Sequence, residues 1–436
     1  MLKQKAFKEI SFLWIGSLLG ALAAFLTQVL LARHLTPSEF GLFATAFATI
    51  ALITPLAGFG VAQYWLKVFG EEGGSALRWM RGSYQFIIKS TFIVILLLFI
   101  WIFLGPNDET TQMVLTLLSS FLISQVLIEL LSVRYQLEER YLLLALWQLT
   151  PHLLRLTLIL VISFTPWVPF NLQTASLIYF SVSILVIITG AKSFIQMLRG
   201  NINLKGHEPT TQPPTISLIH PKSWSVMSNA WPFGLAAFFY FIYYQSNIIL
   251  LNYLVSNEAA GVYNVAFTVM AAVYLLPGVI YQKYLLPKMH RWANHDTEKF
   301  YDVYRYGIKS MFILGTIAMF GVWATSFWAI PLLFGKEYTN AVELLNILAL
   351  SAPIIFLAFN AGATLVTKEN MLRKVKYMGS VAVINIMLNV VLIPMYQEVG
   401  AAIATVISNG VLLYLYSVGT DKYVFQKRKI INVQAS

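Results

Sequence analysis

Long apolar segments, each near the length that a membrane-crossing helix needs, recur along almost the whole chain. Such a helix requires about 20 apolar residues. Only 11% of the 436 residues are charged, against about 25% in soluble domains, so the predicted solvent is lipid. We therefore predict an all-α integral membrane protein with about twelve transmembrane helices. The predicted spans lie near residues 11–33, 38–62, 84–105, 111–133, 141–164, 173–196, 224–251, 259–284, 306–333, 341–366, 374–394 and 399–420.

The first apolar segment is predicted to remain in the protein as a membrane span. It runs from residue 10 to residue 32, which exceeds the roughly 7–15 apolar residues of a secretion signal. No small-residue cleavage site follows before Arg33. A basic patch precedes the segment, formed by Lys3, Lys5 and Lys8.

The basic residues support the predicted number of spans, because almost all of them then lie on one side of the membrane. With the N-terminus inside, the inner segments hold 27 of the 30 Lys and Arg residues, and the outer loops hold only Arg33 and Lys336. Such an excess of positive charge marks the cytoplasmic side of a membrane protein. Twelve spans then place both termini in the cytoplasm. The chain has a net charge of +11 because its basic residues gather in these inner segments, as they do in membrane proteins, so we expect no nucleic-acid partner.

The two halves of the chain carry related segments at one constant offset. Residues 41–47 (GLFATAF) align with residues 261–267 (GVYNVAF), and residues 88–92 (IKSTF) align with residues 308–312 (IKSMF), both pairs 220 residues apart. Six spans per half is an even number, so the two copies insert in the same orientation. Parallel repeats are typical of transporters in which two lobes move around a cavity. The pattern favours a carrier over a channel or an enzyme.

A polar segment rich in Pro, Thr and Asn separates the two halves and predicts the domain boundaries, because such clusters are typical of linkers. We expect an N-terminal six-span lobe at residues 1–200 and a cytoplasmic linker at residues 201–222. A C-terminal six-span lobe at residues 223–424 and a cytoplasmic tail at residues 425–436 follow.

Arg155 is the sharpest case of a charged residue inside a predicted span, where a charge costs at least about 2.5–3.5 kcal/mol. Gln148 and His152 lie seven and three residues before it, so the three share one helix face. Pro151 interrupts the backbone hydrogen bonds beside them. One interpretation is that this face lines a cavity and that Arg155 binds an anionic group such as a phosphate. The other is a structural tie between Arg155 and Glu129 or backbone carbonyls.

Three further charged residues in the spans have both a functional and a structural interpretation. Glu129 lies within about one turn of the inner boundary. It is either a proton or cation site or an interfacial carboxylate near Arg134. Lys89 and Lys309 occupy equivalent positions in the two halves. They either form a basic inner vestibule for an anionic headgroup or extend to the membrane surface, as lysines near helix ends commonly do.

The sequence offers little for metal or thiol chemistry. It has no Cys, and its six His residues are scattered without ligand spacing, so we expect no metal and no cofactor. Several amides lie in the spans. They either contact sugar hydroxyls or, as we favour for most of them, form hydrogen bonds between helices. These amides are Gln28, Asn229, Gln245, Asn247, Asn264, Asn385 and Asn389.

Segments in both halves follow a pattern of spans and turns that is typical of one protein family. Residues 31–41 (LARHLTPSEFG) precede a span that ends with AGFG at residues 57–60, and residues 333–338 (LFGKEY) precede the tenth span. Residues 385–394 (NIMLNVVLIP) lead into residues 400–405 (GAAIAT). In these segments the chain resembles the polysaccharide biosynthesis proteins of the multidrug/oligosaccharidyl-lipid/polysaccharide exporter superfamily.

The resemblance implies a MATE-like fold and a Wzx-like flippase in the inner membrane of a bacterium. Such a flippase moves an undecaprenyl-pyrophosphate-linked oligosaccharide, an O-antigen or exopolysaccharide repeat unit, from the cytoplasmic to the periplasmic leaflet by alternating access. A proton or sodium gradient would drive it, with Glu129 as the candidate coupling residue. Membrane lipids and a polysaccharide polymerase complex are the implied partners. The candidate cavity residues are Arg155, His152, Gln148, Lys89, Lys309 and Arg33.

Three other functions compete with the export of repeat units. A lipid II flippase of the same superfamily usually resembles a fourteen-span protein. A drug/cation antiporter of the same fold needs a carboxylate deep in a lobe, and only Glu129 is available. A membrane polymerase, glycosyltransferase or ligase needs acidic residues or histidines held over the outer surface. The outer loops are short, and only Asp108 and Glu109 pair there, so we predict a transporter rather than an enzyme.

Overall fold

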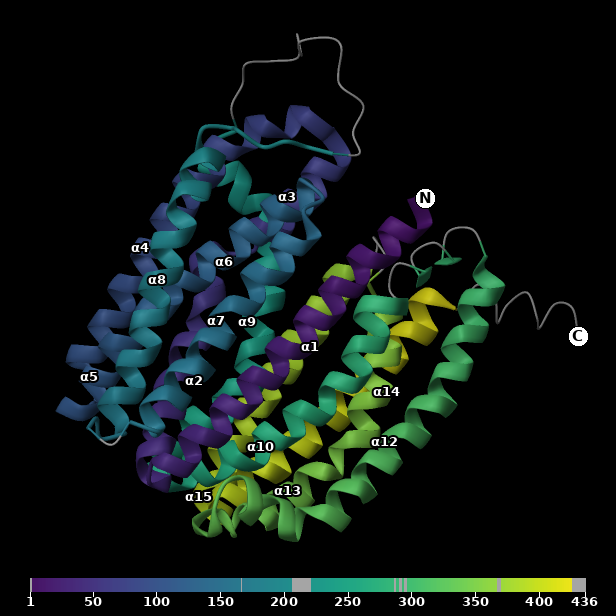
Figure 1. Cartoon of the computed structure of the whole chain (residues 1–436). Coiled ribbons are helices and arrows are strands. Elements are labelled where there is room, and N and C mark those ends of the chain that lie inside the picture. The colour runs from purple at the N-terminus through teal and green to yellow at the C-terminus, as the bar shows by residue number, and fades with distance from the viewer. Residues whose placement is uncertain are drawn as a thin grey trace, which may run out of the picture. The chain divides into compact units, whose positions relative to one another are not determined.

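The computed structural model is almost entirely helical, and the residues that it describes contain no β-strand (Figure 1). The prediction of an all-α protein is therefore confirmed. Most of the predicted linker and tail, residues 206–220 and 426–436, lie outside the described part of the chain. The described residues are 2–165, 167–205, 221–285, 288–289, 292–293, 296–366 and 370–425.

Two series of helices make up the two halves of the chain. The first half contains α1 (Leu2–His34), α2 (Pro37–Gly58), α3 (Val61–Glu72), η1 (Gly73–Trp79), α4 (Met80–Leu104), α5 (Glu109–Leu118), α6 (Ser120–Leu137), α7 (Tyr141–Ser163) and α8 (Leu172–Leu198). The second half contains α9 (Ser223–Leu254), α10 (Asn257–Gly278), η2 (Val279–Leu285), α12 (Thr297–Leu333), η3 (Lys336–Tyr338), α13 (Ala341–Ala349), α14 (Ser351–Thr364), α15 (Met371–Gly419) and η4 (Thr420–Val424).

Nine helical stretches among the described residues are long and apolar enough to cross a membrane, and the pair α13 and α14, bent by 42°, makes a tenth. Two stretches exceed the about 20 residues of one crossing. Pro37–Leu104 has 68 residues and Met371–Val424 has 54. The first breaks at Phe59 and Gly60, both with positive φ, and the second turns at Gln397 (φ 52°, ψ −131°). Each supplies two spans, and the total agrees with the predicted twelve.

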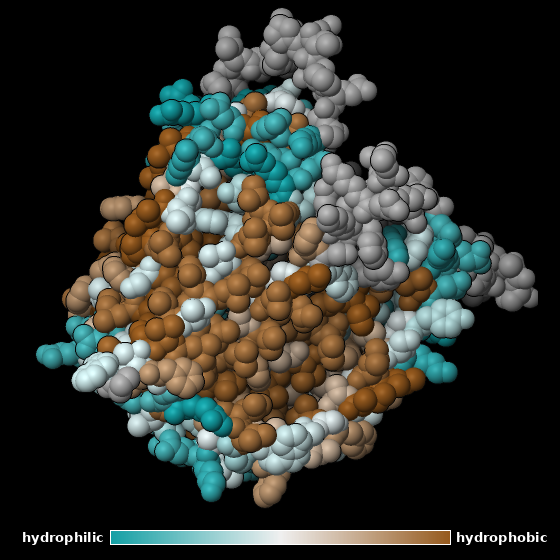
Figure 2. All heavy atoms as spheres, in the orientation of Figure 1, coloured by the Kyte–Doolittle hydropathy of each residue, from teal (hydrophilic) through white to brown (hydrophobic). Residues whose placement is uncertain are grey.

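Large apolar side chains remain exposed on the outside of the helices. Leu18, Phe92, Ile188 and Ile317 are each more than 60% exposed. On the visible face in Figure 2, hydrophobic residues cover the middle of the helices and hydrophilic residues gather toward their ends. Soluble monomers rarely expose apolar patches of more than a few hundred Å². The surface is therefore that of a multi-pass membrane protein.

The chain divides into two compact units, the first of which contains residues 1–35 and 46–241. Helices α1 and α7 pack closely in this unit. The approach depends on Gly16 of α1, because a Cβ there would lie 3.1 Å from the Cβ of Ala145 on α7. Helices α6 and α8 pack against each other and against α7. This arrangement buries Leu149, Pro151, Arg155 and Ile159 of α7, while Leu153 stays exposed.

The second unit contains residues 36–45 and 242–436. Helix α14 packs against both α12 and α15. The first turns of α2 and α10 meet at Gly41 and Gly261, which are equivalent positions of the 220-residue repeat. A Cβ on Gly41 would overlap the carbonyl of Asn257, and one on Gly261 would overlap the carbonyl of Pro37. The lobe boundaries expected from the sequence stay a prediction.

Candidate functional site

Arg155 lies in the interior of the first unit, at the centre of a group of aromatic rings. Its side chain belongs to the buried part of α7 and is only 6% exposed. The guanidinium carbon lies 5.1 Å from the ring centre of Phe121 on α6 and 4.6 Å from that of Tyr179 on α8. Phe47 of α2 contacts both rings, at 4.9 and 5.7 Å between centroids. We call Phe47, Phe121 and Tyr179 the aromatic cage.

No carboxylate neutralises Arg155 within the described structure. Ion pairs of the first unit join Arg78 with Glu72, and both Arg134 and Arg140 with Glu138, and none of these includes Arg155. The Nε atom of Arg155 is buried and has no hydrogen-bond partner. Contact with an aromatic face stabilises a desolvated cation by about 2 kcal/mol. Beside these two rings, the guanidinium therefore still has one buried polar atom that no group in the described part of the chain satisfies.

The predicted polar face of α7 contacts three different helices. Gln148 donates a hydrogen bond to the hydroxyl of Ser132 on α6, at 3.2 Å. His152 lies against α1, where a Cβ on Gly20 would be 3.7 Å from its imidazole ring. Arg155 points toward α6 and α8. Gln148 is exposed, His152 is half-buried and Arg155 is buried, and His152 has a different neighbouring helix from the other two. A common cavity face for the three side chains stays a prediction.

Glu129 of α6, the candidate proton site or interfacial carboxylate near Arg134, forms no ion pair with that arginine in the described part of the chain. Glu129 is half-buried, and the side chain of Gln125, one turn earlier, is placed to hydrogen-bond with it. Arg134 pairs instead with Glu138 at 3.0 Å, in a site where their side chains are only 7% and 3% exposed. Its guanidinium also donates to the carbonyls of Ser193 and Asn201. The spacing of four residues between Arg134 and Glu138 is a signal that sequence reasoning could have used.

The other candidate cations are exposed. Lys89 on α4 and Arg33 on α1 belong to the first unit, and Lys309 on α12 belongs to the second. Exposure suits residues that attract an anion from water, and it equally suits lysines that reach the membrane surface. Their place in a cavity stays a prediction.

A network of buried amides and hydroxyls connects α9, α10 and α15 in the second unit. The Nδ2 atom of Asn247 donates to the hydroxyls of Tyr263 and Thr405, at 2.7 and 2.6 Å. Asn389 donates to the Oδ1 atom of Asn247 at 2.6 Å and to that of Asn385 at 3.1 Å. All five side chains are less than 5% exposed. The preferred interpretation of these three amides, hydrogen bonds between helices, is therefore confirmed.

The aromatic cage and the hydroxyl partners of this network were not identified from the sequence. Aromatic residues make up 14% of the chain, so no single ring stands out in a span. Phe121 and Tyr179 lie on helices other than that of Arg155, and only the fold brings them to it. Nothing in the sequence around Thr405 indicates that its hydroxyl accepts a hydrogen bond from Asn247, because the two residues lie on different helices.

A family model described as "Polysaccharide biosynthesis protein" matches residues 6–292 of the chain. The match covers well over half of the sequence and includes the first series of helices from residue 6 of α1 onward. No curated sequence matches the chain.

Several solved membrane transporters have a similar structure. A lipid II flippase MurJ in an inward closed conformation has a TM-score of 0.70 at 14% identity, over 93% of this chain and 87% of that one. A MOP superfamily transporter from Pyrococcus furiosus gives 0.66 at 14%, over 96% of both chains. An outward-facing multidrug resistance MATE family transporter gives 0.63 at 13%, over 98% and 97%. At these identities the likeness establishes the fold, which is MATE-like with two six-helix lobes in parallel repeat.

Proposed function

This chain belongs to the family of polysaccharide biosynthesis proteins, and we propose that it is a flippase for lipid-linked oligosaccharides. Its substrate in this proposal is an undecaprenyl-pyrophosphate-linked repeat unit of an O-antigen or exopolysaccharide. The protein moves that unit from the cytoplasmic to the periplasmic leaflet of the bacterial inner membrane by alternating access. A polysaccharide polymerase complex then receives it.

The observation that carries this proposal is the buried Arg155 without an acidic partner. A pyrophosphate offers several anionic oxygens, and a guanidinium binds such oxygens with paired, charge-assisted hydrogen bonds. Those bonds are stronger than contacts with aromatic faces, each of which contributes about 0.5–2 kcal/mol. A pyrophosphate can therefore compete with the rings of Phe121 and Tyr179 for the same cation.

The exposed cations give the substrate a route to the membrane-buried arginine. Lys89 and Lys309 lie near the cytoplasmic ends of their helices in the predicted topology, where an anionic headgroup enters. Arg33 lies near the outer end of α1 in that topology, where the headgroup leaves. Charges of one sign raise the local concentration of an oppositely charged ligand. The three residues thus serve capture and release in this proposal, and Arg155 serves binding.

A drug/cation antiporter is the second candidate, and the half-buried Glu129 is the observation that favours it. A carboxylate in a span is a default site for a proton or cation. Replacement by Gln would then abolish transport of an organic cation. The same carboxylate serves as the ion-coupling residue if the protein is a flippase, so the substrate decides between the two functions.

The test is to delete the gene from its host and to measure both surface polysaccharide and lipid-linked repeat units. We expect polymer to disappear and repeat units to accumulate on the cytoplasmic leaflet. Wild-type protein should restore export, Arg155→Ala should reduce it at least about tenfold, and Arg155→Lys should restore it in part because it keeps the charge. Arg81→Ala is the matched control, because Arg81 is an exposed arginine of the same unit.

Two results would contradict the flippase. Unchanged surface polysaccharide in the deletion strain would exclude export of repeat units in that host and favour the antiporter. Repeat units that accumulate unpolymerised on the outer leaflet would indicate a membrane enzyme. All variants are compared at equal abundance in the membrane, so that a folding defect is not read as a loss of transport.

A further inference from the structure

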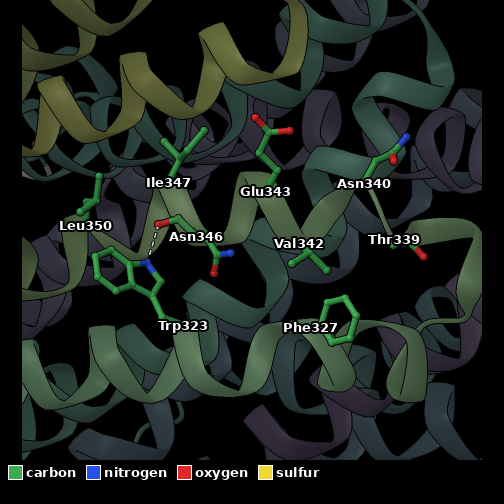
Figure 3. Close-up of a pocket in the computed structure, with 9 residues that line it drawn as sticks. All are labelled: Trp323, Phe327, Thr339, Asn340, Val342, Glu343, Asn346, Ile347 and Leu350. Carbon is green, nitrogen blue, oxygen red and sulfur yellow. Dashed lines mark hydrogen bonds between the residues drawn. The ribbon is translucent and has the colours of Figure 1, made fainter.

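A groove opens on the second unit between α12 and α13 (Figure 3). Its volume is about 560 Å³, which is enough for part of a lipid molecule. All of the residues that line the groove belong to the second unit, so the groove needs no residue of the first unit. The lining residues are Trp323, Phe327, Thr339, Asn340, Val342, Glu343, Asn346, Ile347 and Leu350.

The groove changes from polar to apolar along its length. Thr339, Asn340 and Glu343 lie at the end where the chain enters α13, and Ile347 and Leu350 lie toward the other end (Figure 3). In the predicted topology α12 runs outward across the membrane and α13 runs back from the outer surface. The polar end is therefore at the outer surface and the apolar end lies deeper in the bilayer.

The side of the groove formed by Trp323 is fixed by hydrogen bonds. The indole Nε1 atom of Trp323 donates to the carbonyl of Asn346 at 2.9 Å (Figure 3). The amide oxygen of Asn346 accepts from the hydroxyl of Ser326 at 2.9 Å. These bonds tie α12 to α13 and hold the indole as one wall. The ring of Phe327, 77% exposed, extends the same wall toward the polar end.

Glu343 is the one charged residue among the nine that line the groove. It is exposed and forms no ion pair within the described part of the chain. The lining contains no Lys, Arg or His, so the groove is poorly suited to a pyrophosphate. A lone carboxylate beside hydroxyl and amide groups complements a headgroup that carries an ammonium next to a phosphate. The Asn340 amide can donate to the phosphate oxygens, whereas the Thr339 hydroxyl already donates to the carbonyl of Lys336 at 2.6 Å.

We propose that this groove binds an outer-leaflet phospholipid with a primary-amine headgroup, such as phosphatidylethanolamine. The ammonium pairs with Glu343, and an acyl chain lies along Trp323, Ile347 and Leu350. The occupant is a resident lipid and not the transported substrate, so the proposal goes beyond the proposed function. It holds for a flippase and for an antiporter alike.

The test uses the full-length protein, purified in detergent and stripped of lipid. Phosphatidylethanolamine and phosphatidylglycerol with identical acyl chains are titrated in turn, and bound lipid is counted by native mass spectrometry. Wild type should prefer phosphatidylethanolamine by about fivefold, the factor given by an exposed ion pair of under 1 kcal/mol. Glu343→Gln should remove the preference and leave binding of phosphatidylglycerol unchanged.

Two further variants separate this groove from other lipid contacts. Glu109→Gln is the matched control, because Glu109 is also an exposed acid in the first turn of a helix and does not line the groove. It should keep the fivefold preference. Ile347→Trp fills the apolar end and should lower binding of both lipids. Equal binding of the two lipids by wild type, a preference that survives Glu343→Gln, or undiminished binding by Ile347→Trp would overturn the proposal.

Discussion

Two buried arginines of the first unit are stabilised in opposite ways. Arg134 is surrounded by acceptors, namely the carboxylate of Glu138 and the carbonyls of Ser193 and Asn201. Arg155 is surrounded by aromatic rings and keeps an unpaired Nε. The first arrangement satisfies the charge within the protein and connects α6 with the segment after α8. The second leaves one polar atom of the guanidinium without a partner, which is why we propose a binding role for Arg155 and a structural role for Arg134.

Glu138→Gln tests that structural role. The change leaves Arg134 buried without its counter-charge, and removing one partner of a buried pair costs about 3–5 kcal/mol. We expect the free energy of unfolding to fall by about 3 kcal/mol, measured by titration with a denaturing detergent. Glu72→Gln is the control, because the Arg78–Glu72 pair is 34% and 25% exposed and should matter by less than about 1 kcal/mol. Equal losses in the two variants would contradict the assignment.

At the scale of helices, small residues decide which elements can approach each other. Gly16 lets α1 pack against α7, and Gly41 and Gly261 let the first turns of α2 and α10 touch. Small residues at helix crossings are the usual means of close packing in membranes, where no hydrophobic force drives helices together. The breaks at Phe59 and Gly60 and the turn at Gln397 then divide two long helical stretches into spans.

Gly41→Ala is expected to separate α2 from α10 locally. The added methyl group would overlap the backbone carbonyl of Asn257, which cannot move as a flexible side chain can. Overpacking costs about 1–3 kcal/mol, and the midpoint of thermal unfolding in detergent should fall accordingly. Gly321→Ala in α12 is the control, because its Cβ would meet nothing within 4 Å. That variant should be neutral or slightly more stable.

The whole molecule has a predicted orientation that fusion proteins can test. Alkaline phosphatase should be active when fused after Asn107 or Glu337, in loops predicted to be periplasmic, and inactive after Leu204 or at the C-terminus. Green fluorescent protein should show the opposite pattern, because it folds in the cytoplasm. Activity of the phosphatase at the C-terminus would mean an odd number of spans or a reversed insertion.

The number of spans could be predicted because burial in lipid imposes a length and a composition on every crossing. The break at Leu350 between α13 and α14 was not predicted, although Pro353 in the first turn of α14 is a sequence signal for the start of a new helix. Arg155 could be singled out because a charge in a span is costly. The aromatic neighbours of Arg155 could not be predicted, because Phe121 and Tyr179 lie on other helices and contact the arginine only through tertiary packing. The contact between Asn247 and Asn389 depends in the same way on helices distant in sequence.

The meeting of Gly41 with Gly261 has a consequence for the history of the chain. The two glycines are equivalent positions of the 220-residue repeat, so a duplication would make this a contact between two copies of one segment. Such a self-complementary contact is what a twofold homodimer requires. A six-helix ancestor would thus have paired with itself through one glycine, and fusion of the two genes would have preserved a dimer interface inside a single polypeptide.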